Sequence, residues 1–164
     1  METTVYFLMG LPASGKTTYA MEIVNTYKNG KVVRVNKDDI RSMVYGGTYS
    51  KEKEEFVKKL RNQIIHNALR EYKDVIVDDT NLNPDHYDVI ERIAREHGVR
   101  LEPIFIDTPI ATCIERNRER DKPVPEHVIW DMYEKYILPE KIEARLQLKD
   151  SSKEDAVWVD VDGT

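Results

Sequence analysis

The amino-acid sequence predicts an α/β domain in which helices cover both faces of a doubly wound sheet of about four to five mainly parallel strands. Two observations carry this prediction. Short apolar runs alternate with longer segments whose apolar residues recur at helical spacing, and these runs occupy residues 4–9, 31–36, 74–79 and 100–106. A glycine-containing turn, residues 10–17, joins the first run to the first helical segment. Sheets of this class bind ligands at the carboxyl ends of their strands.

The turn after the first strand has the spacing Gly-x-x-x-x-Gly-Lys-Ser/Thr of a phosphate-binding loop. Gly10 and Gly15 let the backbone approach phosphates and adopt conformations closed to residues with a Cβ. Lys16 is expected to reach the β- and γ-phosphates, and the Thr17 hydroxyl to ligate magnesium. The sequence therefore predicts a P-loop kinase-like fold that binds ATP or another nucleoside triphosphate with Mg²⁺. The expected ATP-binding residues of this loop are Gly10, Ser14, Gly15, Lys16, Thr17 and Thr18.

A short helix is predicted to open at Asn36, directly after the second strand. In open α/β sheets this position faces the ligand crevice. Asp38 and Arg41 are three residues apart and share one helical face, so a carboxylate and a guanidinium can point together into a pocket. The alternative is that Asp38 only stabilises the helix start, where aspartate is favoured whatever the function.

A long helix follows, with Ser50 as its expected N-cap. We expect its buried stripe to consist of apolar residues that recur every four positions, namely Phe56, Leu60, Ile64, Ala68 and Tyr72. Its lysines alternate with acids, which favours a solvated face over a nucleic-acid platform.

The third strand ends in two acids, Asp78 and Asp79. An acid at this place can hold magnesium or orient a cationic side chain across the crevice. Asp79 is the expected functional acid, whereas Asp78 is left open as a loop residue. The run Asp79 to Pro84 can also be only the capping segment of the next helix, which begins with Pro84 and ends at Gly98.

The helix after the fourth strand carries Arg116 and Arg120, which are four residues apart and share a face. They lead into residues 121–125, which contain two prolines and form a mobile-looking connection. This arrangement predicts a helical lid that clamps phosphate, and a solvated basic face is the alternative. Pro125 is expected to open another helix, which Pro139 breaks or kinks. The side chains expected to face inward on that helix are Val128, Met132, Tyr133 and Tyr136.

Composition limits the remaining possibilities. The 164 residues suit one domain, and 40% hydrophobic residues suffice for its core. No apolar run approaches the roughly 20 residues of a membrane span, and no secretory leader is recognisable, so we expect a cytoplasmic protein. Cys113 is the only cysteine, which excludes an internal disulfide and a multi-cysteine metal site. The net charge of -5 argues against broad non-specific binding to nucleic acid.

Four blocks of the sequence resemble the bacteriophage-type 5'-polynucleotide kinase/3'-phosphatase end-repair enzymes, specifically their N-terminal kinase domain. The order and spacing match over nearly the whole chain. The loop is generic, but the second and third blocks are more specific. The blocks are Gly10 to Thr17, Val35 to Arg41, Asp79-Thr80-Asn81-Leu82-Asn83-Pro84, and Arg116 to Arg120 leading to Val124-Pro125 and Met132-Tyr133.

The resemblance implies transfer of the γ-phosphate of ATP to the 5'-hydroxyl end of DNA or RNA. It makes Asp38 the general base and Arg41 the ligand of the acceptor phosphate on the 3' side. Asp79, with Thr80 and Asn81, falls at the acceptor pocket of the family. The implied catalytic residues are Lys16, Asp38, Arg41 and Arg120, and the implied lid residues that bind ATP are Arg116 and Arg120. The chain has Ala13 where the family commonly has glycine.

The resemblance also divides the chain. Residues 1–148 are expected to form the kinase domain, and residues 149–164 a linker and the first strand of a truncated haloacid-dehalogenase-type phosphatase domain, whose nucleophile motif matches Asp160 to Thr164. Two other functions stay open. One is a small-molecule kinase for a nucleoside, sugar or antibiotic, and the other is a non-catalytic switch that binds a nucleoside triphosphate. The oligomeric state is not predicted.

Overall fold

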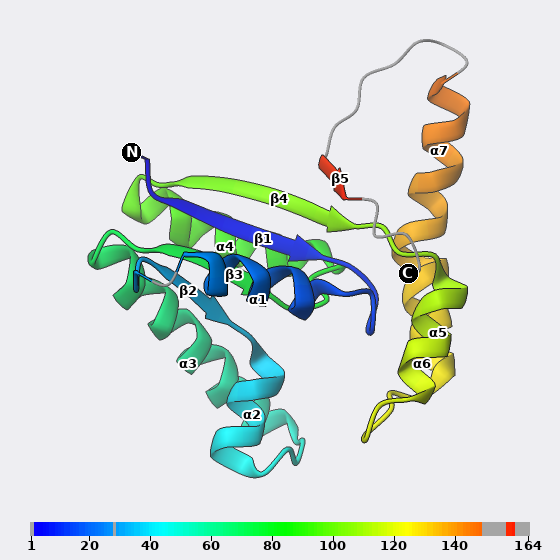
Figure 1. Cartoon of the computed structure of the whole chain (residues 1–164), viewed down its shortest axis with the longest axis horizontal. Helices are drawn as coiled ribbons and strands as arrows, with labels where there is room; N and C mark the ends of the chain where they lie inside the picture. The colour runs from blue at the N-terminus through cyan, green and yellow to red at the C-terminus, as the bar shows by residue number, and fades with distance from the viewer. Residues whose placement is uncertain (1, 28, 149–156, 160–164) are drawn as a thin grey trace.

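The computed structural model describes residues 2–27, 29–148 and 157–159, and it confirms the predicted doubly wound α/β fold (Figure 1). The sheet has the strand order β2-β3-β1-β4-β5, and every neighbouring pair is parallel. Parallel neighbours place all carboxyl ends at one edge, where ligands bind in this class. The strands are β1 (Thr4–Met9), β2 (Val32–Val35), β3 (Asp74–Asp78), β4 (Arg100–Ile106) and β5 (Val157–Val159).

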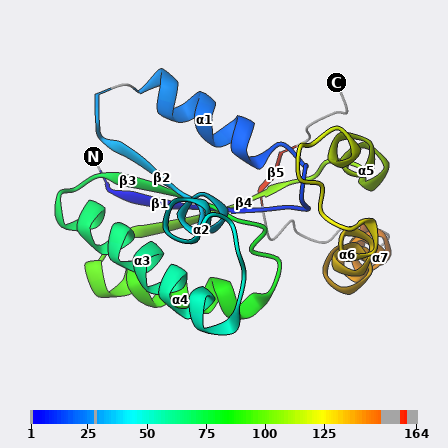
Figure 2. The ribbon, with the colours of Figure 1, turned by 90° about the horizontal axis from the view of Figure 1, so that it is seen from below.

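Helices cover both faces of the sheet, as Figure 2 shows. Helix α1 (Lys16–Thr26) lies on one face, and α3 (Lys51–Arg70) and α4 (Pro84–His97) lie on the other. Helix α2 (Lys37–Tyr45) extends beyond the carboxyl end of β2 (Figure 1). The remaining helical segments gather beyond the end of β4, and they are α5 (Ile110–Arg118), α6 (Glu126–Met132), the π-helical turn η1 (Tyr133–Ile137) and α7 (Leu138–Leu148).

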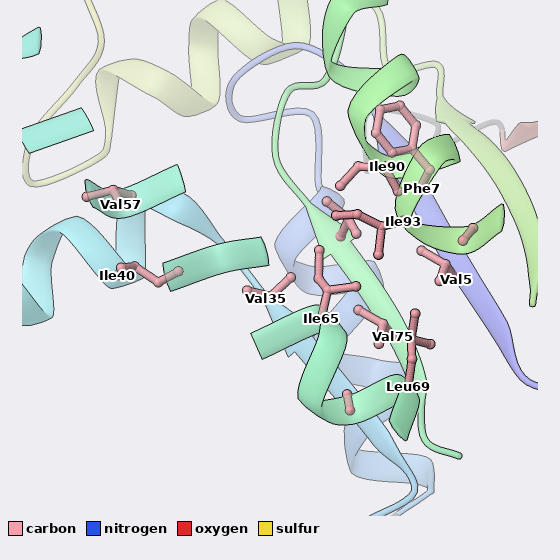
Figure 3. Close-up of a cluster of buried hydrophobic side chains, with 13 residues drawn as sticks. Val5, Phe7, Val35, Ile40, Val57, Ile65, Leu69, Val75, Ile90 and Ile93 are labelled. Carbon is pink, nitrogen blue, oxygen red and sulfur yellow. The ribbon is translucent and has the colours of Figure 1, made fainter. Parts of the chain in front are cut away.

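The core follows the alternation of side chains along the strands. Val5 and Phe7 of β1 point to the face covered by α3 and α4, where they pack with Ile65 and Ile90 (Figure 3). Leu8 points to the other face, against Ala20 of α1. A separate cluster holds the lid helices to the sheet, and it contains Leu11, Phe105, Cys113, Ile114, Ile129 and Ile137. Cys113 is fully buried in it, as an apolar residue would be.

The predicted buried stripe of α3 is wrong at two of its five positions. Phe56 is 45% exposed, and Tyr72 is 83% exposed beyond the end of the helix. A helix advances 3.6 residues per turn, so a row of four-residue steps drifts off the core-facing side. Leu60 and Ile64 are only partly buried, and Ala68 is buried as expected. The side chains that face the core are Val57, Arg61, Ile65, Ala68 and Leu69.

The helical segment after Pro125 also differs in its inward face. Ile129 and Ile137 are buried, whereas Val128, Met132, Tyr133 and Tyr136 are only partly buried. The expected break takes the form of the π-helical turn η1, which ends one residue before α7 begins at Leu138. Pro139 lies in the first turn of α7, and because η1 runs directly into that helix, its missing N–H interrupts the helical hydrogen-bond ladder there.

Strand β5 pairs with β4 in the same sheet, with Phe105 opposite Trp158. The nucleophile motif at 160–164 and the linker at 149–156 lie outside the described residues. The division of the chain into a kinase domain and a phosphatase strand therefore stays a prediction. Among the residues that the structure describes, none of the helices has the length and apolar character that a bilayer crossing requires.

Candidate active site

The loop between β1 and α1 has the backbone of a phosphate cradle. Ala13 and Gly15 adopt positive φ angles of 62° and 102°, so Ala13 holds a left-handed conformation that favours glycine and is under backbone strain. Gly10 is required for close packing, because a Cβ there would lie 2.7 Å from the Ser14 hydroxyl oxygen. The loop is tied to its neighbours by the Thr108 hydroxyl, which donates to the Ser14 carbonyl at 2.5 Å. These contacts hold the loop in the shape of a cradle.

Lys16 lies inside this loop and is buried. Its Nζ donates to the carbonyl oxygens of Gly10 at 2.9 Å and Leu11 at 2.7 Å. Burial lowers the pKa of Lys16 to about 8, although the negative charge of Asp78 opposes that shift. The ammonium group is therefore held at the centre of the cradle in an environment that disfavours its charge until anionic phosphates arrive.

Asp78, left open by the sequence, lies opposite the loop. Its Oδ2 accepts hydrogen bonds from the Thr17 hydroxyl at 3.0 Å and from Arg34 Nε at 2.8 Å. Its Oδ1 is buried without a hydrogen-bond partner among the described residues. A hydroxyl beside a carboxylate with an unused oxygen is a donor set of the kind Mg²⁺ prefers, since that ion takes few protein oxygens and completes its shell with phosphates and water. Thr17 and Asp78 therefore fit a magnesium ion.

Asp38 and Arg41 lie together at the start of α2, as their spacing predicts. Arg41 Nη1 donates to the Asp38 carboxylate, which is 82% exposed. The other edge of the guanidinium is held by Glu54 of α3, whose oxygens accept from Nε at 3.0 Å and from Nη2 at 2.8 and 2.9 Å. This bidentate contact fixes the guanidinium plane and turns Nη1 toward Asp38.

Asp79 lines the rear of the pocket and is 8% exposed. Its Oδ1 accepts from the Lys37 backbone N–H at 2.9 Å, and its Oδ2 is 3.8 Å from Nη1 of the buried Arg61. Burial raises the pKa of Asp79, while the Lys37 N–H and the charges of Lys37 and Arg61 oppose the rise. The expected functional acid thus joins β3, α2 and α3 at the rear of the site.

Asn117 of α5 holds the lid connection in place. Its amide donates to the Val124 carbonyl at 2.7 Å and its amide oxygen accepts from the Val124 N–H at 2.9 Å. Arg118 pairs with Glu126 across the same connection at 2.5 Å. The connection that looks mobile in the sequence is therefore fastened at both ends by side chains.

One pocket of about 720 Å³ brings these groups together. Two predicted residues are not in its lining. Gly10 lies beneath the loop, and the buried Asn81 donates to the Leu8 carbonyl at 2.8 Å, so its amide joins β3 to β1. The predicted residues that line the pocket are Ser14, Gly15, Lys16, Thr17, Thr18, Asp38, Arg41, Asp79, Thr80, Arg116 and Arg120.

The residues that hold the pocket side chains in position were not identified from the sequence. Glu54 is thirteen residues from Arg41 on another helix, and no local spacing links the two. Arg61 had a usable signal, because it occupies the helical row of Val57 and Ile65 as the one charged member. Arg34 had a weaker signal, because it is a cation inside an otherwise apolar strand. The structure pairs it with Asp78 of the neighbouring strand β3.

The fold and the pocket define a P-loop kinase-like domain, which implies binding of ATP or another nucleoside triphosphate. The family model described as AAA domain (AAA_33) matches residues 5–139, and the chain belongs to that family.

The chain is also similar to three proteins with named activities or complexes. The L-seryl-tRNA(Sec) kinase of Methanococcus maripaludis is 32% identical over 134 residues, which are 80% of this chain and 52% of that protein. A protein of Autographa californica nuclear polyhedrosis virus named as a bifunctional polynucleotide kinase/RNA ligase is 29% identical, with 96% of this chain and 24% of that protein covered. A chain in the structure of a Pnkp1/Rnl/Hen1 complex is 26% identical, with a TM-score of 0.63. The match covers 76% of this chain and 45% of the chain in the complex.

These relatives support a kinase, and they are longer than this chain. The chain spans about half of the archaeal kinase and of the Pnkp1/Rnl/Hen1 chain, and about a quarter of the viral protein. The similarity supports a polynucleotide-kinase-like domain rather than a bacteriophage-type enzyme in particular.

Proposed function

We propose that this domain transfers the γ-phosphate of ATP to the 5'-hydroxyl end of DNA or RNA. The observation that carries the proposal is the pair Asp38–Arg41, which lines the same pocket as the phosphate loop. A carboxylate for the hydroxyl proton and a cation for the adjoining phosphate are what a polynucleotide 5' end requires.

On the donor side, Lys16 and the loop N–H groups bind the β- and γ-phosphates, and Arg116 and Arg120 contact the triphosphate from the lid. Thr17 and Asp78 would hold a magnesium ion, which when bound neutralises charge on the phosphates. These cations lower the energy of the negative charge that the transferring phosphoryl group spreads over its oxygens.

On the acceptor side, Arg41 binds the phosphate 3' of the terminal nucleoside and so places its 5'-hydroxyl beside Asp38. The hydroxyl oxygen attacks the γ-phosphorus as its proton passes to the Asp38 carboxylate. The bond from the γ-phosphorus to the bridging oxygen breaks, and ADP leaves with that electron pair. Glu54 holds Arg41 in position for this contact.

A second acceptor is favoured by one observation. The seryl-tRNA(Sec) kinase has 32% identity over 80% of this chain. The competing acceptor is therefore the free side-chain hydroxyl of a serine whose carboxyl group is esterified to tRNA. A small-molecule hydroxyl is a third acceptor that the same phosphate loop would serve. A non-catalytic switch is disfavoured, because such a protein would not need an acid and an arginine opposite its loop together with lid arginines.

The acceptor is tested by incubating the protein with magnesium, γ-labelled ATP and a panel of hydroxyl compounds. The panel holds a 5'-hydroxyl oligonucleotide, the same oligonucleotide with a 5'-phosphate, seryl-tRNA, nucleosides and sugars. We expect label only on the 5'-hydroxyl oligonucleotide, and much slower labelling with Asp38→Asn. Label on seryl-tRNA or on a small compound in preference to the oligonucleotide contradicts the proposal.

A further inference from the structure

The connection from α2 to α3, residues 46–50, exposes a tyrosine beside the acceptor side of the pocket. The Tyr49 side chain is 71% exposed, and its ring centroid lies 5.9 Å from the Arg41 guanidinium carbon. Arg41 lines the pocket, whereas Tyr49 lies outside its lining. The ring therefore lies just outside the pocket, beside the guanidinium that is proposed to bind the acceptor phosphate.

Hydrogen bonds hold this connection in one conformation. The Gly47 N–H donates to the Arg41 carbonyl at 3.2 Å, and the Thr48 hydroxyl donates to the Tyr45 carbonyl at 2.8 Å. The Ser50 hydroxyl caps α3 by accepting from the Lys53 N–H at 3.1 Å. Tyr49 thus lies between two anchored residues, and its exposed ring is presented at little cost in conformational entropy.

The surroundings of Tyr49 combine aromatic rings with cations. Lys53 Nζ lies 5.4 Å from the Tyr45 ring centroid and donates to the Thr48 hydroxyl at 2.8 Å. The Tyr45 ring contacts that of Phe56 edge to face at 6.0 Å, and Phe56 is itself partly exposed. Exposed rings beside cations are typical of surfaces that bind single-stranded nucleic acid by stacking and charge.

We propose that Tyr49 stacks on a nucleobase of a single-stranded acceptor, the base of the nucleotide that follows the phosphate held by Arg41. That phosphate joins the first nucleoside to the second, so the stacked base belongs to the second nucleotide. This inference rests on the proposed function and adds that the acceptor is a strand of two or more nucleotides with an unpaired 5' end. A small acceptor would end at Arg41 and would gain nothing from the ring.

The first test compares two acceptors that differ only beyond Arg41, a nucleoside 3'-monophosphate and a 5'-hydroxyl dodecamer. Tyr49→Ala should raise the KM for the dodecamer about tenfold or more, as expected for one stacked base, and leave the KM for the monophosphate within about twofold. Tyr49→Phe should behave as wild type. Tyr72→Ala is the matched control, because that tyrosine is 83% exposed at the far end of α3.

The second test removes the base instead of the ring. The wild-type protein should bind a dodecamer with an abasic second nucleotide more weakly than the intact dodecamer. This loss of affinity should equal the loss that Tyr49→Ala causes for the intact dodecamer. The two changes together should cost no more than either one, because they delete the same contact. Fully additive losses, equal losses for both acceptors, or a Tyr49→Phe variant as weak as Tyr49→Ala would each overturn the inference.

A binding measurement separates this inference from the proposed function. The fluorescence of Tyr49→Trp should be quenched by the dodecamer without ATP, and that of Tyr72→Trp should not. Quenching without phosphate transfer to any 5'-hydroxyl acceptor would refute the proposed function and leave the stacking site standing. Transfer to the dodecamer without quenching and without a Tyr49→Ala effect would refute the stacking site alone.

Discussion

Asp38 and Asp39 are neighbours, yet their environments differ. The Asp38 carboxylate is exposed at the pocket and pairs with Arg41. Asp39 turns away, and its carboxylate pairs with Arg34 at 2.6 Å. The fold therefore places only one of the two adjacent acids in the pocket. From the sequence, Asp38 could be distinguished from Asp39 only through the resemblance to known kinases.

Asp38→Asn should reduce the rate of phosphate transfer by roughly 10²- to 10⁴-fold, the range for loss of a general base. Its affinity for ATP should stay near that of wild type, because the phosphate loop is untouched. Single-turnover kinetics and equilibrium binding of ATP measure the two effects. Asp39→Asn is the matched control, and a larger loss of rate in that variant would show that Asp39, rather than Asp38, is the general base.

The buried Lys16 gives ATP binding a pH dependence of definite sign. Its pKa is about 8 without nucleotide, and bound phosphates favour the charged form and so raise that pKa. Between the two pKa values the complex holds more protons than the nucleotide-free protein. ATP affinity should therefore fall as pH rises above 8, by up to about tenfold per pH unit.

Calorimetric titration with ATP at pH 8.5, in two buffers of different ionisation enthalpy, should reveal proton uptake on binding. Lys16→Arg should remove the uptake, because a guanidinium stays charged throughout this range. Proton release, or an uptake that Lys16→Arg retains, would show that another group titrates.

At the scale of helices and strands, local chemistry made most of the fold predictable. The four predicted strand ranges match the structure to within one residue at each end, and the N-cap Ser50 and the stop at Gly98 lie where the sequence places them, because these features depend on neighbouring residues. The inward face of α3 was not predictable from a four-residue spacing, since tertiary packing selected the row that includes Arg61.

The candidate site was predictable where it depends on motifs and unpredictable where it depends on contacts between elements. Asp38 and Arg41 share a helix turn, and the structure brings them together. Asp78 and Asp79 are adjacent in sequence, but one accepts from the Thr17 hydroxyl while the other accepts from the Lys37 N–H. Only the packing of α1 and α2 against the end of β3 distinguishes them.

A buried side chain at the end of α5 holds the connection of the lid. Asn117 is 1% exposed and makes both of its hydrogen bonds to Val124. Asn117→Ala should leave the Val124 backbone groups unpaired and shift the connection that follows Arg116 and Arg120. Because small displacements of positioning groups are costly, kcat/KM for ATP should fall roughly ten- to hundredfold.

Two further variants test this role of Asn117. Asn117→Asp keeps the acceptor for the Val124 N–H and loses the donor, so its loss should be intermediate. Arg118→Ala removes only an exposed ion pair with Glu126 and should have little effect. A loss in Arg118→Ala equal to that in Asn117→Ala, with both proteins folded by circular dichroism, would contradict the role.

At the scale of the whole molecule, the strand order separates the two substrates. The phosphate loop follows β1 at the centre of the sheet, the lid helices follow β4 on one side, and Asp38 and Arg41 follow β2 on the other (Figure 1). With the proposed roles, donor and acceptor would approach from opposite sides and meet over the carboxyl ends of β1 and β3. Each substrate would then be held by elements that do not bind the other.

Binding of the two substrates should be separable by mutation. ATP at 100 times its Kd adds about 2.7 kcal/mol to the free energy of unfolding, which for a domain of this size raises Tm by roughly 5–11 °C. Lys16→Ala should abolish that rise and keep its affinity for a labelled 5'-hydroxyl oligonucleotide within about twofold. Arg41→Ala should keep the rise and lose oligonucleotide affinity. Thermal unfolding and fluorescence anisotropy measure the two responses, and a variant in which both fail together while the protein stays folded would show that the halves of the pocket are one site.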